Sequence, residues 1–211
     1  MIQRRLQGGV LLSDYDLVVS LVEPGSRVLD LGCGNGVLLQ RLIDERRVSG
    51  MGVEIEQNAV IDCIHKGLSV FQGDIDAGLA DYGNDSYDYV ILNQTLQVIR
   101  RPDFVIEEML RVGRRAIISF PNFAYWRIRA LLAWSGRMPR TPKLPFEWYD
   151  TPNIHLLTIN DFLAFCRERQ IQVLTRLYLN RGLRTRQKTL RWLPNLRADE
   201  GLFVITRQTE K

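Results

Sequence analysis

Three glycines at alternating positions follow a short apolar run near the start of this sequence. Residues 28–31 read as a buried strand, and Gly32, Gly34 and Gly36 come directly after it. Glycine permits a tight turn and lets a ligand approach the backbone with no Cβ in the way. The helix predicted to follow presents free N–H groups at its start. The pattern therefore predicts a ligand-binding loop over residues 31–36.

This loop differs from the two glycine-rich loops that bind phosphates. A dinucleotide fingerprint needs a third glycine where this sequence has Val37, and no Lys-Ser or Lys-Thr pair follows as in a P-loop. Asp30 stands two residues before Gly32. A carboxylate there repels a pyrophosphate and suits a cationic amino group. We therefore predict a ligand with a cationic end, and a tight turn without a ligand is the alternative.

Two further acids follow predicted strands. Glu54 ends the strand predicted over 50–54, where a carboxylate can accept hydrogen bonds from both hydroxyls of a ribose. Asp74 follows the strand predicted over 68–71. It can accept a hydrogen bond from the amino group of adenine while Ile75 packs on the ring, and a cap or turn aspartate is the alternative. With the glycine loop, these residues predict an adenosine site.

The elements that must position this site alternate through the first 120 residues. Predicted strands cover 27–31, 50–54, 68–71, 87–92 and 116–120, and predicted helices cover 13–22, 37–46, 57–66 and 102–112. Such repeats imply parallel strands joined by right-handed crossovers, and continuous apolar strands imply that helices cover both faces of the sheet.

The pattern changes after residue 121. A helix is predicted over 123–134, and a segment with four prolines and no clear period follows it. We interpret residues 123–157 as a lid or insertion. A capped helix is predicted over 158–169, and strands over 171–179 and 202–206 flank a long basic connection.

Length and composition fit one domain over residues 1–211. The chain is 45% hydrophobic and 25% charged, which is ordinary for a globular protein. The start has no apolar signal region and no segment reads as a membrane span, so we expect a cytoplasmic location. The cysteines Cys33, Cys63 and Cys166 are far apart, and they indicate neither disulfides nor a zinc site. We expect no metal.

Charge is distributed unevenly along the chain. Residues 1–110 carry 9 Lys or Arg and 17 Asp or Glu, whereas residues 111–211 carry 19 and 7. The basic half could face an anionic partner, or it could be a solvated surface or a protein interface.

Two groups of residues keep several interpretations. His155 could be a general base or could brace the lid, while His65 is expected on the surface. The aromatic and basic segment 123–129, with Trp134 and nearby aromatics, also has several interpretations. It could wall a substrate pocket, stack nucleic-acid bases or form a protein docking face.

The glycine loop and the two acids resemble the motifs of class I S-adenosylmethionine (SAM) dependent methyltransferases. That resemblance implies a Rossmann-like α/β fold with a mostly parallel seven-stranded sheet, an antiparallel last strand and helices on both faces. It implies binding of SAM or S-adenosylhomocysteine. The residues that it assigns to the cofactor are Asp30, Gly32, Cys33, Gly34, Glu54, Ile55, Asp74, Ile75 and Asn93.

A more particular resemblance runs almost from end to end. Residues 23–36, 93–97, 119–123 and 153–158 resemble the MetW family of methionine biosynthesis proteins. This resemblance implies a link to a homoserine O-acyltransferase of the MetX type. Three classes of function stay open. They are a SAM-binding partner or regulatory subunit of that acyltransferase, a methyltransferase acting on an unknown small molecule, and a nucleic-acid methyltransferase, which we rank last.

Overall fold

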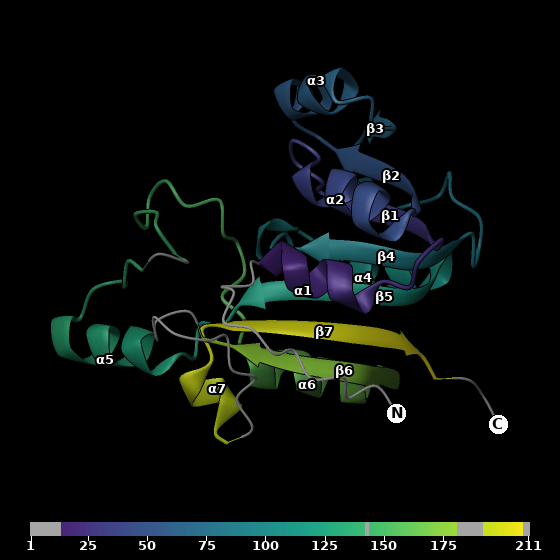
Figure 1. The fold of residues 1–211 in the computed structure, drawn as a ribbon. Helices are drawn as coiled ribbons and strands as arrows, with labels where there is room; N and C mark the ends of the chain where they lie inside the picture. The colour runs from purple at the N-terminus through teal and green to yellow at the C-terminus, as the bar shows by residue number, and fades with distance from the viewer. Residues whose placement is uncertain (1–13, 142–143, 181–191, 209–211) are drawn as a thin grey trace.

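The computed structural model describes residues 14–141, 144–180 and 192–208 (Figure 1). Through β5 the elements are α1 Asp14–Leu21, β1 Arg27–Leu31, α2 Val37–Arg46, β2 Ser49–Glu54, α3 Gln57–His65, β3 Val70–Gln72, η1 Ile75–Ala77, β4 Tyr87–Asn93, η2 Leu96–Val98, α4 Pro102–Val112 and β5 Gly113–Pro121. The later elements are α5 Trp126–Ser135, α6 Ile159–Glu168, β6 Ile171–Leu179, α7 Pro194–Arg197 and β7 Glu200–Arg207. The predicted helix start at Ser13 and residues 181–191 of the predicted basic connection lie outside the described residues.

The seven strands form one sheet in the order β3-β2-β1-β4-β5-β7-β6. Strands from β3 through β5 pair in parallel, and β7 is antiparallel to both β5 and β6. The prediction of a mostly parallel sheet with an antiparallel last strand is confirmed. The chain fills one side of β1 with β2 and β3 and then returns to its other side with β4. The crevice between β1 and β4 is therefore the topological switch point, where open α/β sheets bind ligands.

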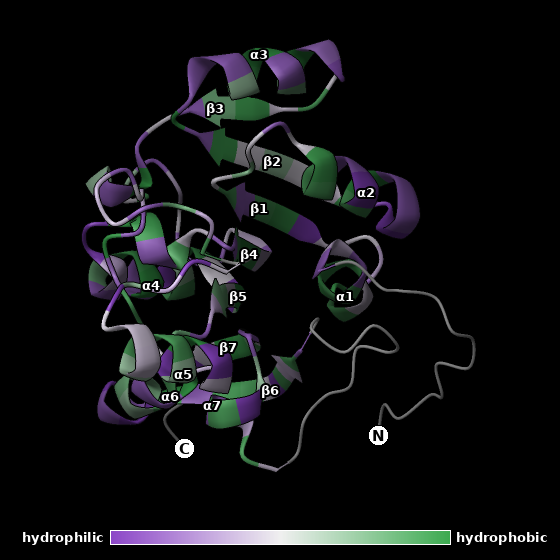
Figure 2. Cartoon of the chain, turned by 90° about the vertical axis from the view of Figure 1, so that its left-hand side faces the viewer, coloured by the Kyte–Doolittle hydropathy of each residue, from purple (hydrophilic) through white to green (hydrophobic). Residues whose placement is uncertain are grey.

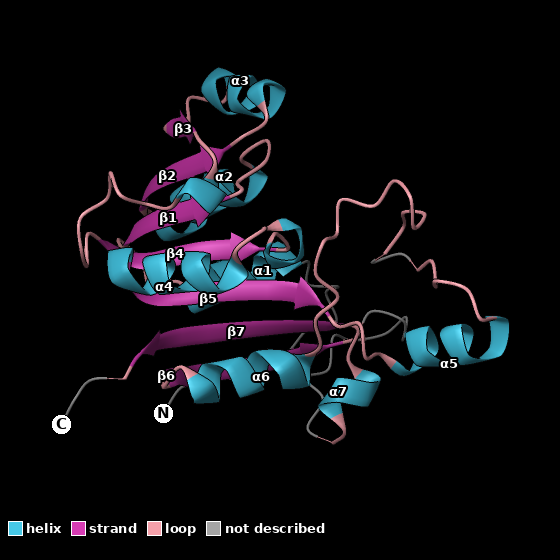
Figure 3. Cartoon of the chain, turned by 180° about the vertical axis from the view of Figure 1, so that it is seen from behind, coloured by secondary structure: helices cyan, strands magenta, loops and turns pink. Residues whose placement is uncertain are grey.

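Helices cover both faces of this sheet. The face toward the viewer in Figure 1 carries α1 and α2, and the opposite face, seen in Figure 3, carries α4 and α6. Figure 2 shows the strands between these two layers. Residues Val90 to Leu92 of β4 are accordingly 0% exposed. Burial on both faces is the reason why the strands read as continuous apolar runs.

Local signals set several element boundaries. Helices α2 and α4 and strand β6 have the predicted bounds. Pro102 begins α4, where a missing N–H costs nothing. Thr158 caps α6 because its hydroxyl accepts a hydrogen bond from the Asp161 amide, while the Asp161 carboxylate accepts one from the Thr158 amide. This reciprocal pair is a capping box.

The helix predicted from Phe123 begins three residues later, at Trp126. The Asn122 side-chain oxygen accepts a hydrogen bond from the Ala124 amide at 3.1 Å. The Phe123 amide donates to the Leu157 carbonyl at 3.1 Å. These bonds satisfy the backbone in a turn rather than in a helix, which a helical periodicity does not reveal.

After β5 the chain leaves the sheet and returns to it at α6. Helix α5 projects beyond the carboxyl ends of the parallel strands (Figure 1), and Ile128 is its one buried residue. Residues 123–157, the predicted lid or insertion, comprise α5 and the segment that leads back to α6. The longest described helix, α4, has 11 residues, and no described helix is long and apolar enough to cross a bilayer.

Candidate functional site

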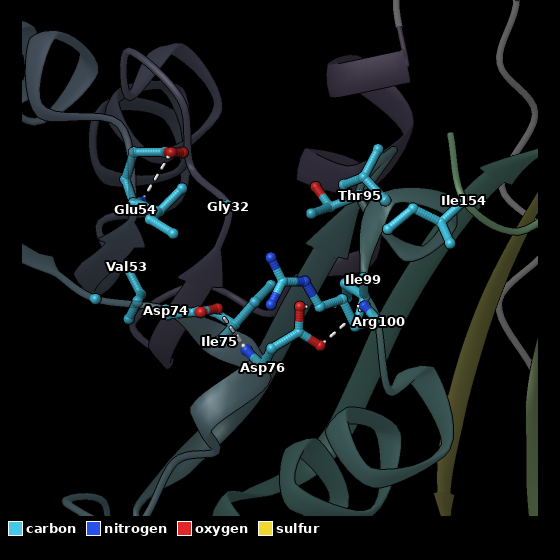
Figure 4. A pocket seen from close by; sticks show the side chains of 13 residues that line it. Gly32, Val53, Glu54, Asp74, Ile75, Asp76, Thr95, Ile99, Arg100 and Ile154 are labelled. Carbon is cyan, nitrogen blue, oxygen red and sulfur yellow. Dashed lines mark hydrogen bonds between the residues drawn. The ribbon is translucent and has the colours of Figure 1, made fainter. Parts of the chain in front are cut away.

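A pocket of about 440 Å³ lies at the carboxyl ends of β1 and β2, beside the switch point (Figure 4). The glycine loop, the end of β2, η1, η2 and one residue of the segment before α6 contribute to its walls. The lining residues are Gly32, Val53, Glu54, Ile55, Gly73, Asp74, Ile75, Asp76, Thr95, Val98, Ile99, Arg100 and Ile154. The sequence predicted five of these residues as cofactor ligands, and the fold brings them together.

The glycine loop holds a backbone that other residues adopt poorly. Gly32 has φ 67° and Gly34 has φ 54°. A Cβ on Gly32 would lie 2.9 Å from Thr95 Oγ1, whereas a Cβ on Gly34 would meet nothing within 4 Å. Gly32 therefore permits close packing against the segment after β4. Gly34 leaves open space beside the backbone, as a loop that admits a ligand requires.

Asp30 lies beneath the loop and is 2% exposed. Its Oδ2 atom has no hydrogen-bond partner among the described residues. Burial, and secondly the negative charge of Glu54, raise the pKa of Asp30 to about 7. Asp30 does not itself line the pocket. A buried carboxyl with an unpartnered oxygen favours a nearby cation, because a positive charge would stabilise its ionised form.

Glu54 ends β2, lines the pocket and is 9% exposed. Its Oε1 atom accepts hydrogen bonds from the amides of Ile55 at 2.9 Å and Glu56 at 3.0 Å, and its Oε2 atom accepts one from Gly34 at 2.8 Å. A carboxylate has about four acceptor positions. The backbone therefore fixes Glu54 against the glycine loop and leaves capacity on Oε2 for a ligand hydroxyl.

Asp74 is placed where it can act as a turn cap and as an acceptor toward a ligand, the two roles considered for it from the sequence. Its carboxylate accepts a hydrogen bond from the Asp76 amide at 2.9 Å and so caps η1. The same residue lines the pocket together with Ile55 and Ile75. Ile55 is 63% exposed, an unusual exposure for an aliphatic side chain. The two isoleucines give the pocket apolar surfaces on which a planar ring can pack.

Asn93 lies below the pocket and not in its wall. Its side-chain oxygen accepts a hydrogen bond from Ser119 Oγ at 2.6 Å. That hydroxyl oxygen accepts one from the Gln94 amide at 3.0 Å, and Gln94 Nε2 donates to Glu200, 0% exposed, at 2.6 Å. Gln94 has φ 57°. This partly buried network fixes the turn from β4 into η2, which carries the far wall of the pocket.

The cysteines are free and buried. Cys33 packs its sulfur into the space above Gly52, only 2.5 Å from where a Cβ on that glycine would stand. Burial raises the pKa of the Cys33 thiol well above its ordinary value and that of Cys166 to about 11. These thiols are therefore protonated and poor ligands or nucleophiles near neutral pH. Among the described residues, no three His, Cys, Asp or Glu side chains are grouped to hold a metal ion.

His155 faces a different pocket. It lines a neighbouring cavity of about 400 Å³ between η2, α4 and α6. Its Nε2 atom is buried and has no hydrogen-bond partner among the described residues. The preceding residue, Ile154, does line the first pocket, and both of their amides donate to the Gln97 carbonyl, at 2.8 and 3.0 Å. The imidazole thus lies beside the first pocket rather than in it. His65 is exposed at the end of α3.

Several lining residues were not predicted as site residues, although Thr95 falls in the segment 93–97 of the family resemblance. Thr95 is the N-cap of η2, Val98 ends η2, and Ile99 and Arg100 follow it. The Asp76 carboxylate accepts hydrogen bonds from the Arg100 amide at 2.9 and 3.1 Å, which joins η2 to η1. Figure 4 shows the Arg100 side chain extending into the pocket. Residues 95–100 follow β4 at the same sheet edge as the glycine loop. That position is the clue in the sequence that they could line the pocket.

Solved structures show the same fold. A SAM-dependent methyltransferase from Methanosarcina mazei matches 94% of this chain and 100% of its own with a TM-score of 0.66 and 12% identity. A methyltransferase of Haloferax volcanii, solved with the Trm112 methyltransferase activator, matches 89% and 85% with a TM-score of 0.62 and 18% identity. At these identities the likeness shows the fold alone. It confirms the predicted class I SAM-dependent methyltransferase fold.

Closer sequence relatives identify the family. The bifunctional methionine biosynthesis protein MetXA/MetW of Rhodopirellula baltica is 36% identical over 206 residues, covering 92% of this chain. The chain spans about a third of that relative, 33% of its length. The sequence model described as "Methionine biosynthesis protein MetW" matches residues 12–205. This protein belongs to the MetW family.

Proposed function

We propose that the pocket beside the switch point binds SAM or S-adenosylhomocysteine. The observation that carries this is the buried Asp30 carboxyl beneath the open glycine loop, whose Oδ2 atom has no hydrogen-bond partner among the described residues, because it favours a ligand with a cationic amino group. Glu54 and Asp74 supply acceptors for ribose and adenine, and Ile55 and Ile75 supply apolar walls. When bound, SAM supplies an electrophilic methyl group on a sulfonium.

We propose further that the protein acts with a homoserine O-acyltransferase of the MetX type as its partner or regulatory subunit. The support is the relative that carries MetXA and MetW in one chain. Fusion keeps two parts at a high effective concentration, which serves parts that work on each other.

Among the described residues lining the pocket, none is a histidine or a cysteine. The three free thiols suit a reducing compartment, and we place this activity in the cytoplasm.

The test is an acyltransferase assay with purified components. The rate of homoserine acylation is measured for the enzyme alone, with this protein, and with this protein plus SAM. We expect this protein to change the rate, and SAM to alter the size of that change. Rates that are identical in all three mixtures, with no complex by sedimentation, would show that the partnership is wrong. Calorimetric titration with SAM tests the cofactor separately.

The alternative is a SAM-dependent methyltransferase acting on an unknown small molecule. The cavity of about 400 Å³ between η2, α4 and α6 favours it, because that cavity adjoins the pocket through Arg100 and contains His155. Methyl transfer from a sulfonium needs mainly positioning and desolvation, so a weak base suffices. The assay measures transfer of a labelled methyl group from SAM to molecules of a metabolite extract. Transfer by the wild type that is lost in Glu54→Ala would establish this function instead.

A further inference from the structure

The region between β5 and α6 exposes large apolar side chains. We define the arm as residues 126–141 and 144–149. Trp134 is 95% exposed, Trp148 75%, Tyr149 71%, Trp126 51%, and Leu132 40%. Large exposed apolar side chains in one segment of a folded chain are a feature of interaction sites, and Trp, Tyr and Arg are the residues that dominate binding energy at such sites.

We propose that the arm is the surface that docks the acyltransferase, and that it inserts into an apolar hollow with an acidic rim on that enzyme. This inference rests on the proposed partnership and adds to it the place and chemistry of the contact. Helix α5 lies beyond the sheet (Figures 1 and 3), so the arm can reach a partner without the body of the domain moving.

The sequence of α5 suits a hollow that surrounds it. Seven of its ten residues, in WRIRALLAWS, are apolar, yet Ile128 alone is buried. A helix on the surface of a soluble domain normally has one apolar stripe that faces the core. Here the apolar residues lie around the helix. A helix of this length is marginal by itself in water, so a covering partner would stabilise it.

The positive charge of the arm favours acidic residues around the hollow on the partner. Residues 122–146 contain no Asp or Glu. Arg140 pairs with Glu147, whereas Arg127 and Arg137 form no ion pair with any described residue. Acidic side chains on the partner would complement these arginines and speed the encounter.

The same features argue against other occupants. A second copy of this chain would bring the same arginines against each other, which repels. Nucleic acid would use the aromatic rings and arginines but leave Leu131 and Leu132 without a role. An anionic membrane binds helices whose apolar and polar faces are separate, and α5 has no such separation. A protein hollow satisfies both the aliphatic and the cationic residues.

The experiment measures affinity of the full-length protein for the purified acyltransferase of the same organism by calorimetry or biolayer interferometry. The arm variants are Trp134→Ala, Trp148→Ala and Arg127→Glu. Their matched controls are Ile64→Ala, on α3 and 61% exposed, and Arg207→Glu, exposed at the end of β7. SAM affinity and melting temperature are measured for every variant.

We expect each arm variant to lose about tenfold or more in affinity for the acyltransferase, with unchanged SAM affinity and melting temperature, and the controls to bind as the wild type does. If the wild type binds and all three arm variants bind equally well, the arm inference is overturned while the partnership stands. If the wild type does not bind the acyltransferase, both are overturned. Arm-dependent self-association, or arm-dependent binding to RNA or to anionic vesicles in place of the acyltransferase, also overturns the inference.

Discussion

The pocket and the arm lie at the same end of the sheet and are built in opposite ways. Around the pocket, backbone amides fix Glu54 and a buried network fixes the turn after β4. In the arm, Trp134 is 95% exposed and Ile128 is the one buried residue of α5. Residues around the pocket are therefore tied to the stability of the fold, whereas exposed side chains of the arm such as Trp134 are not. We expect this difference to let the pocket hold a ligand in a fixed geometry while the arm contacts a partner.

The largest expected effect is the pH dependence that Asp30 imposes on stability. Its folded pKa of about 7 lies above its ordinary 3.8, so the unfolded chain releases this proton first and stability falls as pH rises from 3.8 to about 7. Asp30→Asn should remove up to about 4 kcal/mol of that loss. Urea unfolding of both proteins between pH 4 and pH 8 measures it. If the difference in stability between the two proteins did not change with pH over this range, the raised pKa of Asp30 would be contradicted. Asp30→Asn should also bind SAM more weakly.

Two glycines of the loop separate stability from binding. A Cβ on Gly36 would lie 2.4 Å from Leu68 Cδ1 and 2.8 Å from Cys63 Sγ, whereas a Cβ on Gly34 meets nothing within 4 Å. Gly36→Ala should cost about 2–4 kcal/mol of stability through strain and overpacking. Gly34→Ala should cost about 1–2 kcal/mol and mainly weaken SAM binding. Thermal unfolding and calorimetry check the pair, and equal destabilisation by both would contradict the geometry.

Glu54 tests the ribose contact. Glu54→Ala should weaken SAM binding by roughly 1–3 kcal/mol because a buried ligand hydroxyl loses an ionised acceptor. Calorimetry at constant pH measures this, with Glu56→Ala as the control because Glu56 is an exposed neighbour. Equal SAM affinity in the Glu54 variant and the wild type would remove this residue from the site.

The smallest effect is expected in the arm. Trp134→Ala and Trp148→Ala, at side chains 95% and 75% exposed, should change the free energy of unfolding by less than about 0.5 kcal/mol. Denaturant titration measures this change. A loss above about 1 kcal/mol for either variant would mean that the arm packs on the domain, and the contrast with the pocket would disappear.

The sequence was informative wherever one local pattern determines one structure. The glycine loop, the acid that ends β2 and the Pro102 helix start depend on residues adjacent in the chain, and the fold has them as predicted. Sequence could not reveal that Asp76 joins Arg100 to the pocket, since these residues lie 24 positions apart. Nor could it place Ile154 in the pocket and His155 outside it. The cavity that each of two neighbouring side chains faces depends on the backbone path, and the sequence pattern does not give that path.

The carbonyl of Gln97 holds the segment that connects the arm with the pocket. It accepts the amides of Ile154 and His155, so the chain that returns from the arm is pinned at the pocket wall. Ile154 therefore belongs to the pocket and is only five residues from Tyr149, at the end of the arm. A partner that shifted Ile154 on binding to the arm would change the affinity of any ligand that contacts Ile154 in the pocket. Thermodynamic reciprocity would then require the ligand to change the affinity of the partner by the same factor.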